Sequence, residues 1–189
     1  MKNLKSIAIA LLVVFGTTVS AQTTKKVDVS NSSITWVAKK VTGSHAGKVN
    51  LKEGVLIFAK GNKLTGGSFT VDMTSIVVTD LAAGKGKEKL EGHLTSDDFF
   101  GTEKYPEAML VFKNIDKKGN VYKITSDLTI KGVTKSVMLD LTVTGNKATS
   151  KFKIDRTKYD IKYGSGSFFD NLGDKAINDE FEVAVTLIF

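Results

Sequence analysis

The chain has 189 residues, of which 41% are hydrophobic and 25% are charged, and its formal net charge is +7. This balance is typical of a globular protein and excludes disordered, fibrous and polytopic membrane proteins. Cysteine is absent, which excludes disulfide scaffolds, thiolate metal sites, thiol nucleophiles and a lipid-modified N-terminal cysteine. One proline and 17 glycines favour a sheet with glycine-containing turns over a helical bundle.

The first residues have the pattern of a secretory signal peptide. Two lysines precede an unbroken run of nine apolar residues from Ile7 to Phe15, and Val19-Ser20-Ala21 offers a cleavage site. The apolar run is too short to span a bilayer, although a retained anchor is the alternative. We therefore expect residues 1–21 to be removed and residues 22–189 to form a single domain. Loss of the two lysines leaves 25 basic and 20 acidic side chains, a net charge of +5.

Apolar and polar residues alternate along most of the remaining chain. In the last segment, for example, Phe181, Val183 and Val185 alternate with mostly polar neighbours. Successive side chains of a strand point to opposite faces, so each such segment has one apolar face. Short turns rich in glycine, asparagine and lysine separate the segments, which implies antiparallel neighbours. The expected strands cover residues 27–29 with 34–40, 48–59, 63–77, 108–115, 121–131, 134–144, 148–157 and 180–189.

Two segments interrupt the alternation. Within residues 80–107, Ser96 followed by Asp97-Asp98 is typical of a helix N-terminus, so a short helix is expected to begin there. Residues 164–178 are expected to contain another helical turn. Eight amphipathic strands can bury their apolar faces by closing into a barrel, which also removes exposed sheet edges. The predicted fold is all-β, an eight-stranded antiparallel barrel with one or two short helices, and its interior is either filled or holds a small ligand.

The polar residues form no recognisable catalytic or metal-binding motif. The two histidines, His45 and His93, lack the spacing of a helical metal site. Asp97-Asp98 is better explained by charge at a helix N-terminus than by acid–base catalysis. Residues 164–167 are glycine-rich but lack the lysine of a phosphate-binding loop. We therefore expect no enzyme activity, cofactor or metal site, and the scattered lysines predict no nucleic-acid partner.

Arg156 is the only arginine, and it follows Phe152 and Ile154 on the apolar face of its predicted strand. A buried arginine needs an acidic partner or an anionic ligand group. Two interpretations follow: Arg156 pairs with a local acid and locks the barrel, or it meets the phosphate or carboxylate head of a ligand at a cavity mouth. Replacement by methionine separates them, because lost ligand affinity with unchanged melting would favour the second.

A series of motifs occurs in a fixed order along the chain. They are Trp36, Leu64–Phe69, His93-Leu94 with Ser96–Phe100, Tyr105-Pro106, Leu128–Lys135 and Asp155–Tyr159. In this order they resemble the YceI-like family of secreted, lipocalin-like barrels, over about residues 27–189. The resemblance implies an extended barrel whose inner tunnel holds a long isoprenoid or fatty chain, export to the periplasm, and no catalytic residues.

The chain departs from the family pattern at two places. Leu90-Glu91 stands where the family often has Arg-Asp, and Tyr159-Asp160 stands where it often has an aromatic residue followed by glycine. The missing arginine argues against a head-group contact shared with the family at that position. The lysine-rich residues 84–89 are expected to make the mouth of the barrel differ from that of the family.

The leading hypothesis is a non-enzymatic carrier or binding protein for a long apolar molecule, polyisoprenoid or fatty-acid-like, held inside the barrel. Burial of apolar surface contributes about 25 cal/mol per Å², so an alkyl tail is held without any reaction. Each candidate ligand-binding residue is equally explained by ordinary barrel core. The candidates are Trp36, Phe58, Phe69, Val71, Phe112, Leu128, Ile130, Phe152, Arg156, Phe181 and Val183.

The alternative hypothesis is a solid-core accessory module that contacts an envelope protein or glycan through its loops at 80–107 and 160–178. In either case we expect a periplasmic or secreted location. The expected partner is an apolar lipid or isoprenoid ligand. Transient contact with a membrane surface and formation of a homodimer are left open.

Overall fold

The computed structural model describes residues 22–189, so the predicted signal peptide at residues 1–21 lies outside the described residues. The strands are β1 (Thr23–Lys26), β2 (Ser33–Lys40), β3 (Gly43–Ala59), β4 (Lys63–Val78), β5 (Glu107–Lys118), β6 (Val121–Ile130), β7 (Val133–Thr144), β8 (Lys147–Asp155) and β9 (Ile177–Ile188). The helices are α1 (Lys87–Thr95) and two short 3-10 helices, η1 (Arg156–Tyr159) and η2 (Gly173–Lys175). In this part of the chain, no helix combines the length and apolar character needed to cross a membrane.

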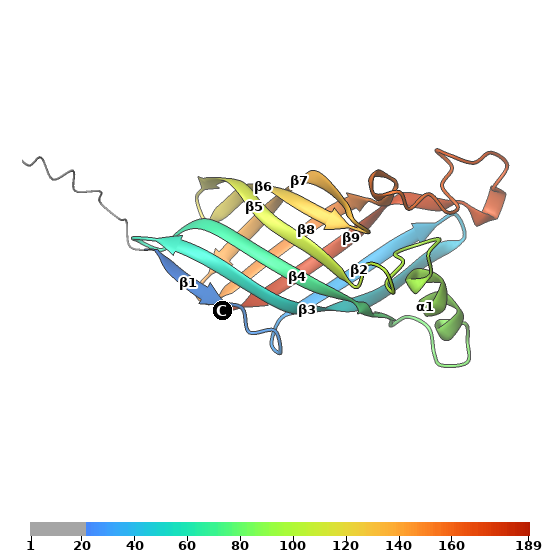
Figure 1. Ribbon diagram of the computed structural model, residues 1–189, viewed down its shortest axis with the longest axis horizontal. Helices are drawn as coiled ribbons and strands as arrows, with labels where there is room; N and C mark the ends of the chain where they lie inside the picture. Colours follow the sequence, from blue (N-terminus) through green and yellow to red (C-terminus); the bar gives the residue numbers. More distant parts are fainter. Residues whose placement is uncertain (1–21) are drawn as a thin grey trace, which may run out of the picture.

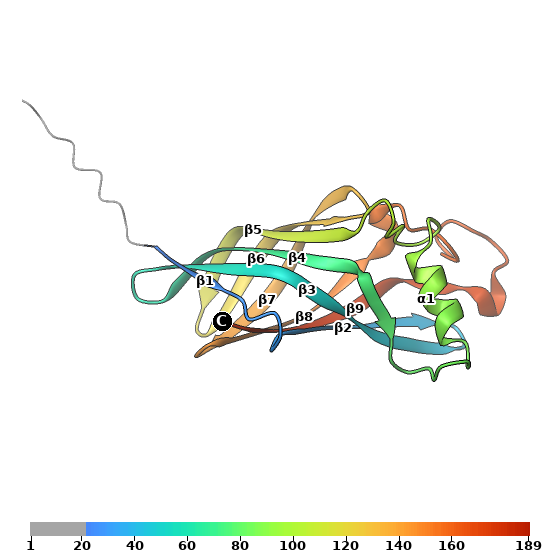
Figure 2. The same ribbon diagram turned by 60° about the horizontal axis from the view of Figure 1, so that its bottom comes forward.

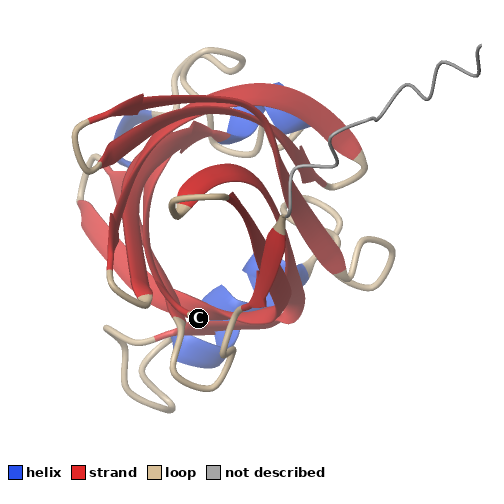
Figure 3. Cartoon of the chain, turned by 90° about the vertical axis from the view of Figure 1, so that its left-hand side faces the viewer, coloured by secondary structure: helices blue, strands red, loops and turns tan. Residues whose placement is uncertain are grey.

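Eight of the strands form a closed antiparallel barrel, as predicted. Their order around the ring is β3-β2-β9-β8-β7-β6-β5-β4, and pairing between β4 and β3 closes it. Figure 3 shows this ring end-on. The short strand β1 pairs with β3, with Thr23 opposite Phe58, on the edge of β3 that β2 occupies further along. Closure gives every barrel strand a neighbour on both sides. The β4–β5 pairing covers only Ser68–Asp72 of β4, and the β7–β8 pairing covers only Leu141–Thr144 of β7.

The two ends of the elongated barrel differ, as Figures 1 and 2 show. One end carries the tight β3–β4, β5–β6 and β7–β8 turns together with the C-terminus, and we call it the hairpin end. The other end carries α1 and the long connections at residues 79–106 and 156–176, and we call it the α1 end.

The hairpin end is filled by side chains of the barrel itself. Leu56, Leu64 and Ile124 are almost completely buried there. The ring of Phe58 packs against that of Phe189, with 5.6 Å between ring centroids. This half of the barrel therefore has the solid core that apolar alternation predicts.

The alternation predicted most strands to within a few residues, but three predicted segments need correction. The strand predicted over residues 48–59 begins earlier, at Gly43, and the short strand β1 was not predicted. Residues 27–29 are not a strand, because the Asp28 side chain accepts hydrogen bonds from the backbone N–H groups of Ser30 (3.1 Å) and Asn31 (3.2 Å) and forms a turn. The strand predicted to reach residue 157 ends at Asp155. There the Asp155 carboxylate accepts from the Thr157 N–H (3.0 Å) and begins η1.

The helix predicted to begin at Ser96 is wrong in position, because α1 ends there. The N–H and the hydroxyl of Ser96 both donate to the His93 carbonyl oxygen, at 3.2 and 2.8 Å. Serine satisfies the exposed backbone groups of a helix terminus, and here it serves the C-terminal one. The helix itself is formed by the preceding lysine, glutamate and leucine residues, which are good helix formers. The helical turn expected within residues 164–178 is confirmed as η2.

Candidate functional site

Between the filled hairpin end and α1, the barrel encloses an apolar cavity of about 170 Å³. Inward side chains of all eight barrel strands contribute to its wall. The lining residues with polar side chains are Ser150, Arg156 and Asn178. The Ser150 hydroxyl donates to the Asp140 carbonyl oxygen (2.7 Å), so it is already satisfied by the protein. The cavity therefore offers hydrocarbon contact and very little hydrogen bonding.

Three aromatic rings of the wall lie against glycines of a neighbouring strand, and one of them is Phe112 on β5, which lies against Gly67 on β4. Trp36 on β2 is paired with Gly47 on β3, and a Cβ atom at Gly47 would collide with the indole ring. Gly54 on β3 is opposite Phe69 on β4, and a Cβ atom there would lie 2.7 Å from the Phe69 ring. Because glycine presents no side chain, these rings can lie along the wall instead of crossing the lumen. This arrangement leaves open space in a barrel that carries many large side chains.

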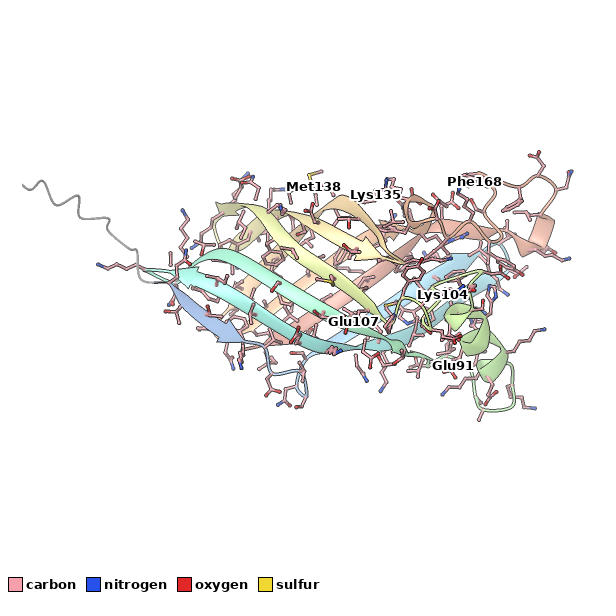
Figure 4. All side chains as sticks on the ribbon, viewed as in Figure 1. Glu91, Lys104, Glu107, Lys135, Met138 and Phe168 are labelled. Carbon is pink, nitrogen blue, oxygen red and sulfur yellow. The ribbon has the colours of Figure 1, made fainter. Side chains whose placement is uncertain are left out.

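At the α1 end, the cavity is covered by α1 and by the turn that follows it. Leu94 of α1 and Phe99 and Phe100 of the turn line the cavity, and all three are buried. Glu91 attaches α1 to the barrel, because its carboxylate accepts a hydrogen bond from the Val78 N–H (2.8 Å) at the end of β4. Figure 4 shows Glu91 on the helix. The Leu90-Glu91 departure seen in the sequence thus has a structural role.

Arg156 lies at the α1 end of the cavity and is 2% exposed. Its guanidinium donates to three backbone carbonyl oxygens, those of Ile161 (2.8 Å), Ile177 (3.0 Å) and Asn178 (3.1 Å). The bonds to Ile177 and Asn178 connect η1 to the start of β9, and the bond to Ile161 fixes the loop that follows η1. The geometry therefore favours the interpretation that Arg156 locks the barrel, because each of its three nitrogens already donates to a carbonyl oxygen of the protein.

Asp179 completes this buried cluster. Its Oδ1 atom lies 3.7 Å from Nη2 of Arg156, and its Oδ2 atom accepts from the Ser167 hydroxyl (2.5 Å). Burial acts to raise the pKa of Asp179, but the hydroxyls of Ser165 and Ser167 and the charge of Arg156 outweigh it, so the pKa lies below its ordinary value. Burial lowers the pKa of Arg156, against the opposing charge of Asp179. The positive charge is thus compensated within the protein, without an anionic ligand.

Tyr159 of η1 is 1% exposed, and its hydroxyl has no hydrogen-bond partner. Burial, followed by the negative charge of Asp155, raises its pKa from 10.0 to about 12. The folded state therefore holds this proton more tightly than the unfolded state does. Its contribution to stability is complete below pH 10 and is lost as the pH rises towards 12.

We predict that Tyr159→Phe removes this part of the alkaline destabilisation. Over that pH window the wild type should lose about 2–3 kcal/mol more unfolding free energy than the variant. At neutral pH the variant should be at least as stable as the wild type, because the substitution removes a buried hydroxyl that makes no hydrogen bond. Denaturant unfolding at a series of pH values measures the unfolding free energy at neutral pH and its loss at alkaline pH. Tyr163→Phe, at an exposed tyrosine, is the control. Parallel curves for wild type and Tyr159→Phe would contradict the assignment.

Ten of the eleven candidate ligand-binding residues are brought together on the cavity wall. They are Trp36, Phe69, Val71, Phe112, Leu128, Ile130, Phe152, Arg156, Phe181 and Val183. Phe58 is the exception, because it belongs to the filled core of the hairpin end. The inward orientation of Phe58 was predicted correctly, but Phe58 lies closer to the hairpin end than the cavity does.

The wall also includes residues that the sequence prediction omitted. Leu139, Leu141 and Leu187 line the cavity and share the alternation that identified the other candidates, so the same signal could have found them. Phe99 and Phe100 come from a turn that was expected to be helical. No period-two pattern marks them, and their role follows only from how that turn packs over the barrel.

The titratable groups outside the Arg156 cluster do not converge on the cavity. Within residues 22–189, no group of three or more histidine, cysteine or acidic side chains is placed to hold a metal ion. His45 pairs with Asp80 (2.9 Å), while His93 contacts the rings of Phe99 and Tyr163 in edge-on and tilted arrangements. Asp97 forms an exposed ion pair with Lys104 (2.6 Å). The chemistry that the cavity itself supplies is burial of hydrocarbon.

Comparison with known proteins shows which family the sequence matches. The profile of the YceI-like domain matches residues 26–189. The UPF0312 protein plu2095 of Photorhabdus laumondii is 36% identical over 86 residues, which are 42% of this chain and 45% of that protein. Protein YceI of Escherichia coli O157:H7 is 34% identical over 74 residues, which are 39% of each. The aligned region thus spans less than half the length of these curated relatives.

Solved structures share the barrel. BcnA of Burkholderia cenocepacia superposes with a TM-score of 0.69 at 23% identity, covering 86% of this chain and 99% of BcnA. A polyisoprenoid-binding domain from Saccharophagus degradans, implicated in plant cell wall breakdown, gives a TM-score of 0.59 at 13% identity, covering 89% of this chain and 97% of the domain. At these identities the likeness shows a common fold.

Proposed function

The chain belongs to the YceI-like domain family, and on this basis we propose that it is a non-enzymatic binding or carrier protein for a long-chain apolar molecule held in its barrel. The occupant we infer is polyisoprenoid or fatty-acid-like, in line with the polyisoprenoid-binding domain that shares its fold. The place of action is the periplasm or the cell exterior, in line with the pattern of residues 1–21.

The observation that carries this proposal is the apolar cavity. An engineered apolar cavity of about 150 Å³ stays dry and binds benzene. The cavity of about 170 Å³ is lined in the same way, so it holds a short stretch of alkyl or prenyl chain without rearrangement. A longer chain extends by displacing flexible wall side chains such as Met73, whose unbranched thioether adapts readily.

The energetics of the site favour a hydrocarbon and disfavour a charged head group inside the barrel. Each buried methylene contributes about 0.8 kcal/mol, whereas a buried anion without free donors is costly. The guanidinium of Arg156 is engaged by carbonyl oxygens and lies close to Asp179. We therefore place the polar end of the ligand outside the wall of the cavity.

A solid-core accessory module is the second candidate, and the filled hairpin end is the observation that favours it. That solid region includes Leu56, Phe58, Leu64 and Ile124, none of which lines the cavity. In this candidate the loops at the α1 end bind an envelope protein or glycan and the cavity stays empty. The two candidates therefore differ in whether the cavity takes up an alkyl chain.

The only tryptophan of the chain provides a direct reporter, because Trp36 lines the cavity and is 7% exposed. Bromine quenches indole fluorescence on close contact. We predict that ω-bromododecanol quenches Trp36 in a saturable way, and that dodecanol lacking bromine competes with it. Free bromoethanol is the control for access from solvent, and it should quench weakly. Absence of saturable quenching by the long-chain probe would contradict the carrier function and favour the accessory module.

A further inference from the structure

The α1 end of the barrel exposes a group of large apolar side chains on two adjacent loops. Phe168, Phe169 and Tyr163 are each about half exposed, and Val41 in the β2–β3 turn is 65% exposed. The Val41 N–H donates to the Ala176 carbonyl oxygen (3.2 Å), which joins the β2–β3 turn to the loop containing the aromatic residues. We call residues 160–176 the aromatic loop. Figure 4 shows Phe168 at the outer side of this loop.

Local hydrogen bonds hold the two phenylalanines in a defined turn. The N–H groups of Phe168 (3.1 Å) and Phe169 (3.0 Å) both donate to the carbonyl oxygen of Ser165, a residue with no exposed surface. At the far side of the turn, the Ile177 N–H donates to the Gly164 carbonyl oxygen (2.8 Å). The loop therefore presents both rings to solvent from a buried anchor.

A row of aromatic contacts runs from the aromatic loop to the cavity. Tyr163 contacts His93 of α1 in a tilted arrangement with 4.4 Å between ring centroids, and His93 contacts the Phe99 ring at 5.4 Å. Phe99 contacts Phe100 at 5.1 Å, and Phe100 contacts Phe181 at 6.4 Å. Phe99, Phe100 and Phe181 line the cavity. An apolar molecule that reaches the exposed loop thus meets a continuous series of rings leading inwards.

We propose that the aromatic loop docks on a lipid bilayer, with the rings of Phe168 and Phe169 at the boundary between head groups and acyl chains. The apolar chain then passes between the aromatic loop and α1, along the row of rings, into the cavity. This proposal rests on the proposed carrier function and adds the source from which the barrel is loaded.

The physical state of the ligand favours a bilayer as the partner. A cavity whose wall is almost entirely apolar suits long hydrocarbon chains, which partition into membranes rather than dissolve in water. A few protruding rings also suit insertion into a fluid surface. A stable protein interface, by contrast, buries about 800 Å² on each partner around a packed centre.

The charges around the loop are compatible with phospholipid head groups. Lys39 and Lys40 precede Val41, and Lys175 follows the phenylalanines; all three are exposed. The ammonium of Lys162 lies 5.0 Å from the centre of the Phe168 ring, and Lys162 also pairs with Asp160 (3.3 Å). Acidic Asp170 and Asp174 lie on the same loop, so the local charge is nearly balanced. Insertion of the rings is therefore the main contribution, and the lysines add a modest preference for anionic lipid.

The test compares a double variant of the loop with a matched double variant elsewhere. Phe168→Ser with Phe169→Ser removes the proposed inserting rings. Met109→Ser with Met138→Ser removes two exposed apolar side chains from the barrel wall, where Figure 4 shows Met138 far from the aromatic loop. Both pairs are substantially exposed, so neither variant is expected to change folding, which melting curves check.

Loading is measured as quenching of Trp36 by ω-bromohexadecanol supplied in vesicles of phosphatidylethanolamine and phosphatidylglycerol. For the wild type and the methionine variant, the loading rate should rise with vesicle concentration. For the phenylalanine variant, the rate should fall at least tenfold, while equilibrium binding of ω-bromododecanol added from ethanol is unchanged.

The possible outcomes separate the two proposals. Equal loading rates for the wild type and the phenylalanine variant, with intact quenching, would overturn docking and leave the carrier function in place. Absence of quenching from either source would instead overturn the carrier function itself. If the phenylalanine variant only abolishes a dimer in analytical ultracentrifugation and loads normally, the loop is an interface with a second copy of the chain, and docking is wrong.

Discussion

Ala108→Phe is expected to weaken the binding of alkyl chains strongly by filling the cavity from its wall. Ala108 is buried on β5 and lines the cavity. The added phenyl ring is about as large as benzene, which an apolar cavity of similar size binds. Displacing four methylenes of a bound chain removes about 3 kcal/mol, so affinity for ω-bromododecanol should fall more than a hundredfold. Titration monitored by Trp36 fluorescence measures the change.

Met109→Phe is the matched control, because Met109 is the next residue on the same strand and points out of the barrel, where it is 46% exposed. It adds a ring of similar size without entering the cavity, and its affinity should equal that of the wild type. Thermal unfolding should show that both variants are folded. Wild-type affinity in a folded Ala108→Phe protein would show that the chain binds elsewhere.

Arg156→Met is expected to destabilise the fold by about 3–5 kcal/mol, because it removes a buried charge and leaves its partners unpaired. Three carbonyl oxygens, those of Ile161, Ile177 and Asn178, would lose their donors. Asp179 would lose the positive charge that helps to keep its pKa low. The melting temperature should therefore fall strongly, and denaturant unfolding gives the free energy directly.

Arg156→Lys is the informative companion, since it keeps the charge but cannot donate to three separate carbonyl groups. It should be intermediate in stability between the wild type and Arg156→Met. Lys158→Met serves as the control on the same 3-10 helix, because Lys158 is exposed and its ion pair with Asp155 contributes little. Unchanged melting of Arg156→Met together with lost affinity for an anionic alkyl probe would reverse the interpretation and assign Arg156 to a ligand head group.

The period of two predicts which face of a strand is buried, and the structure confirms this for nearly every candidate. Trp36, Phe112 and Val183 were selected by alternation, and all line the cavity. The same pattern placed Phe58 inside the barrel, but alternation carries no information on depth along the axis. Phe58 packs on Phe189 at the hairpin end, where side chains fill the interior.

Whether the barrel is open or filled depends on details that a periodic pattern does not encode. Trp36 lies against Gly47 because the two are paired across β2 and β3. That register becomes known only when the strands are assembled. The sequence shows Gly47, but it does not show that Gly47 lies opposite Trp36. The alternation was compatible with either a filled or an open interior. The barrel contains both, since it is filled at the hairpin end and open towards the α1 end.

The cover of the cavity was the hardest part to predict. Ser96 followed by acidic residues resembles a helix N-terminus, yet the same serine can serve the end of a preceding helix. The turn beyond it places Phe99 and Phe100 over the lumen, and this follows from tertiary packing alone. Arg156 was correctly expected on the inner side, although it begins η1 instead of ending a strand.

The most direct measurement of the central claim is the position of a bound alkyl chain. Crystals grown with ω-bromododecanol allow the bromine to be located by anomalous diffraction. We predict a bromine peak inside the barrel, in contact with the cavity wall formed by Trp36, Phe112 and Phe181. An unoccupied interior, with bromine bound only on the outer surface of the protein, would contradict the proposal that this barrel carries apolar chains.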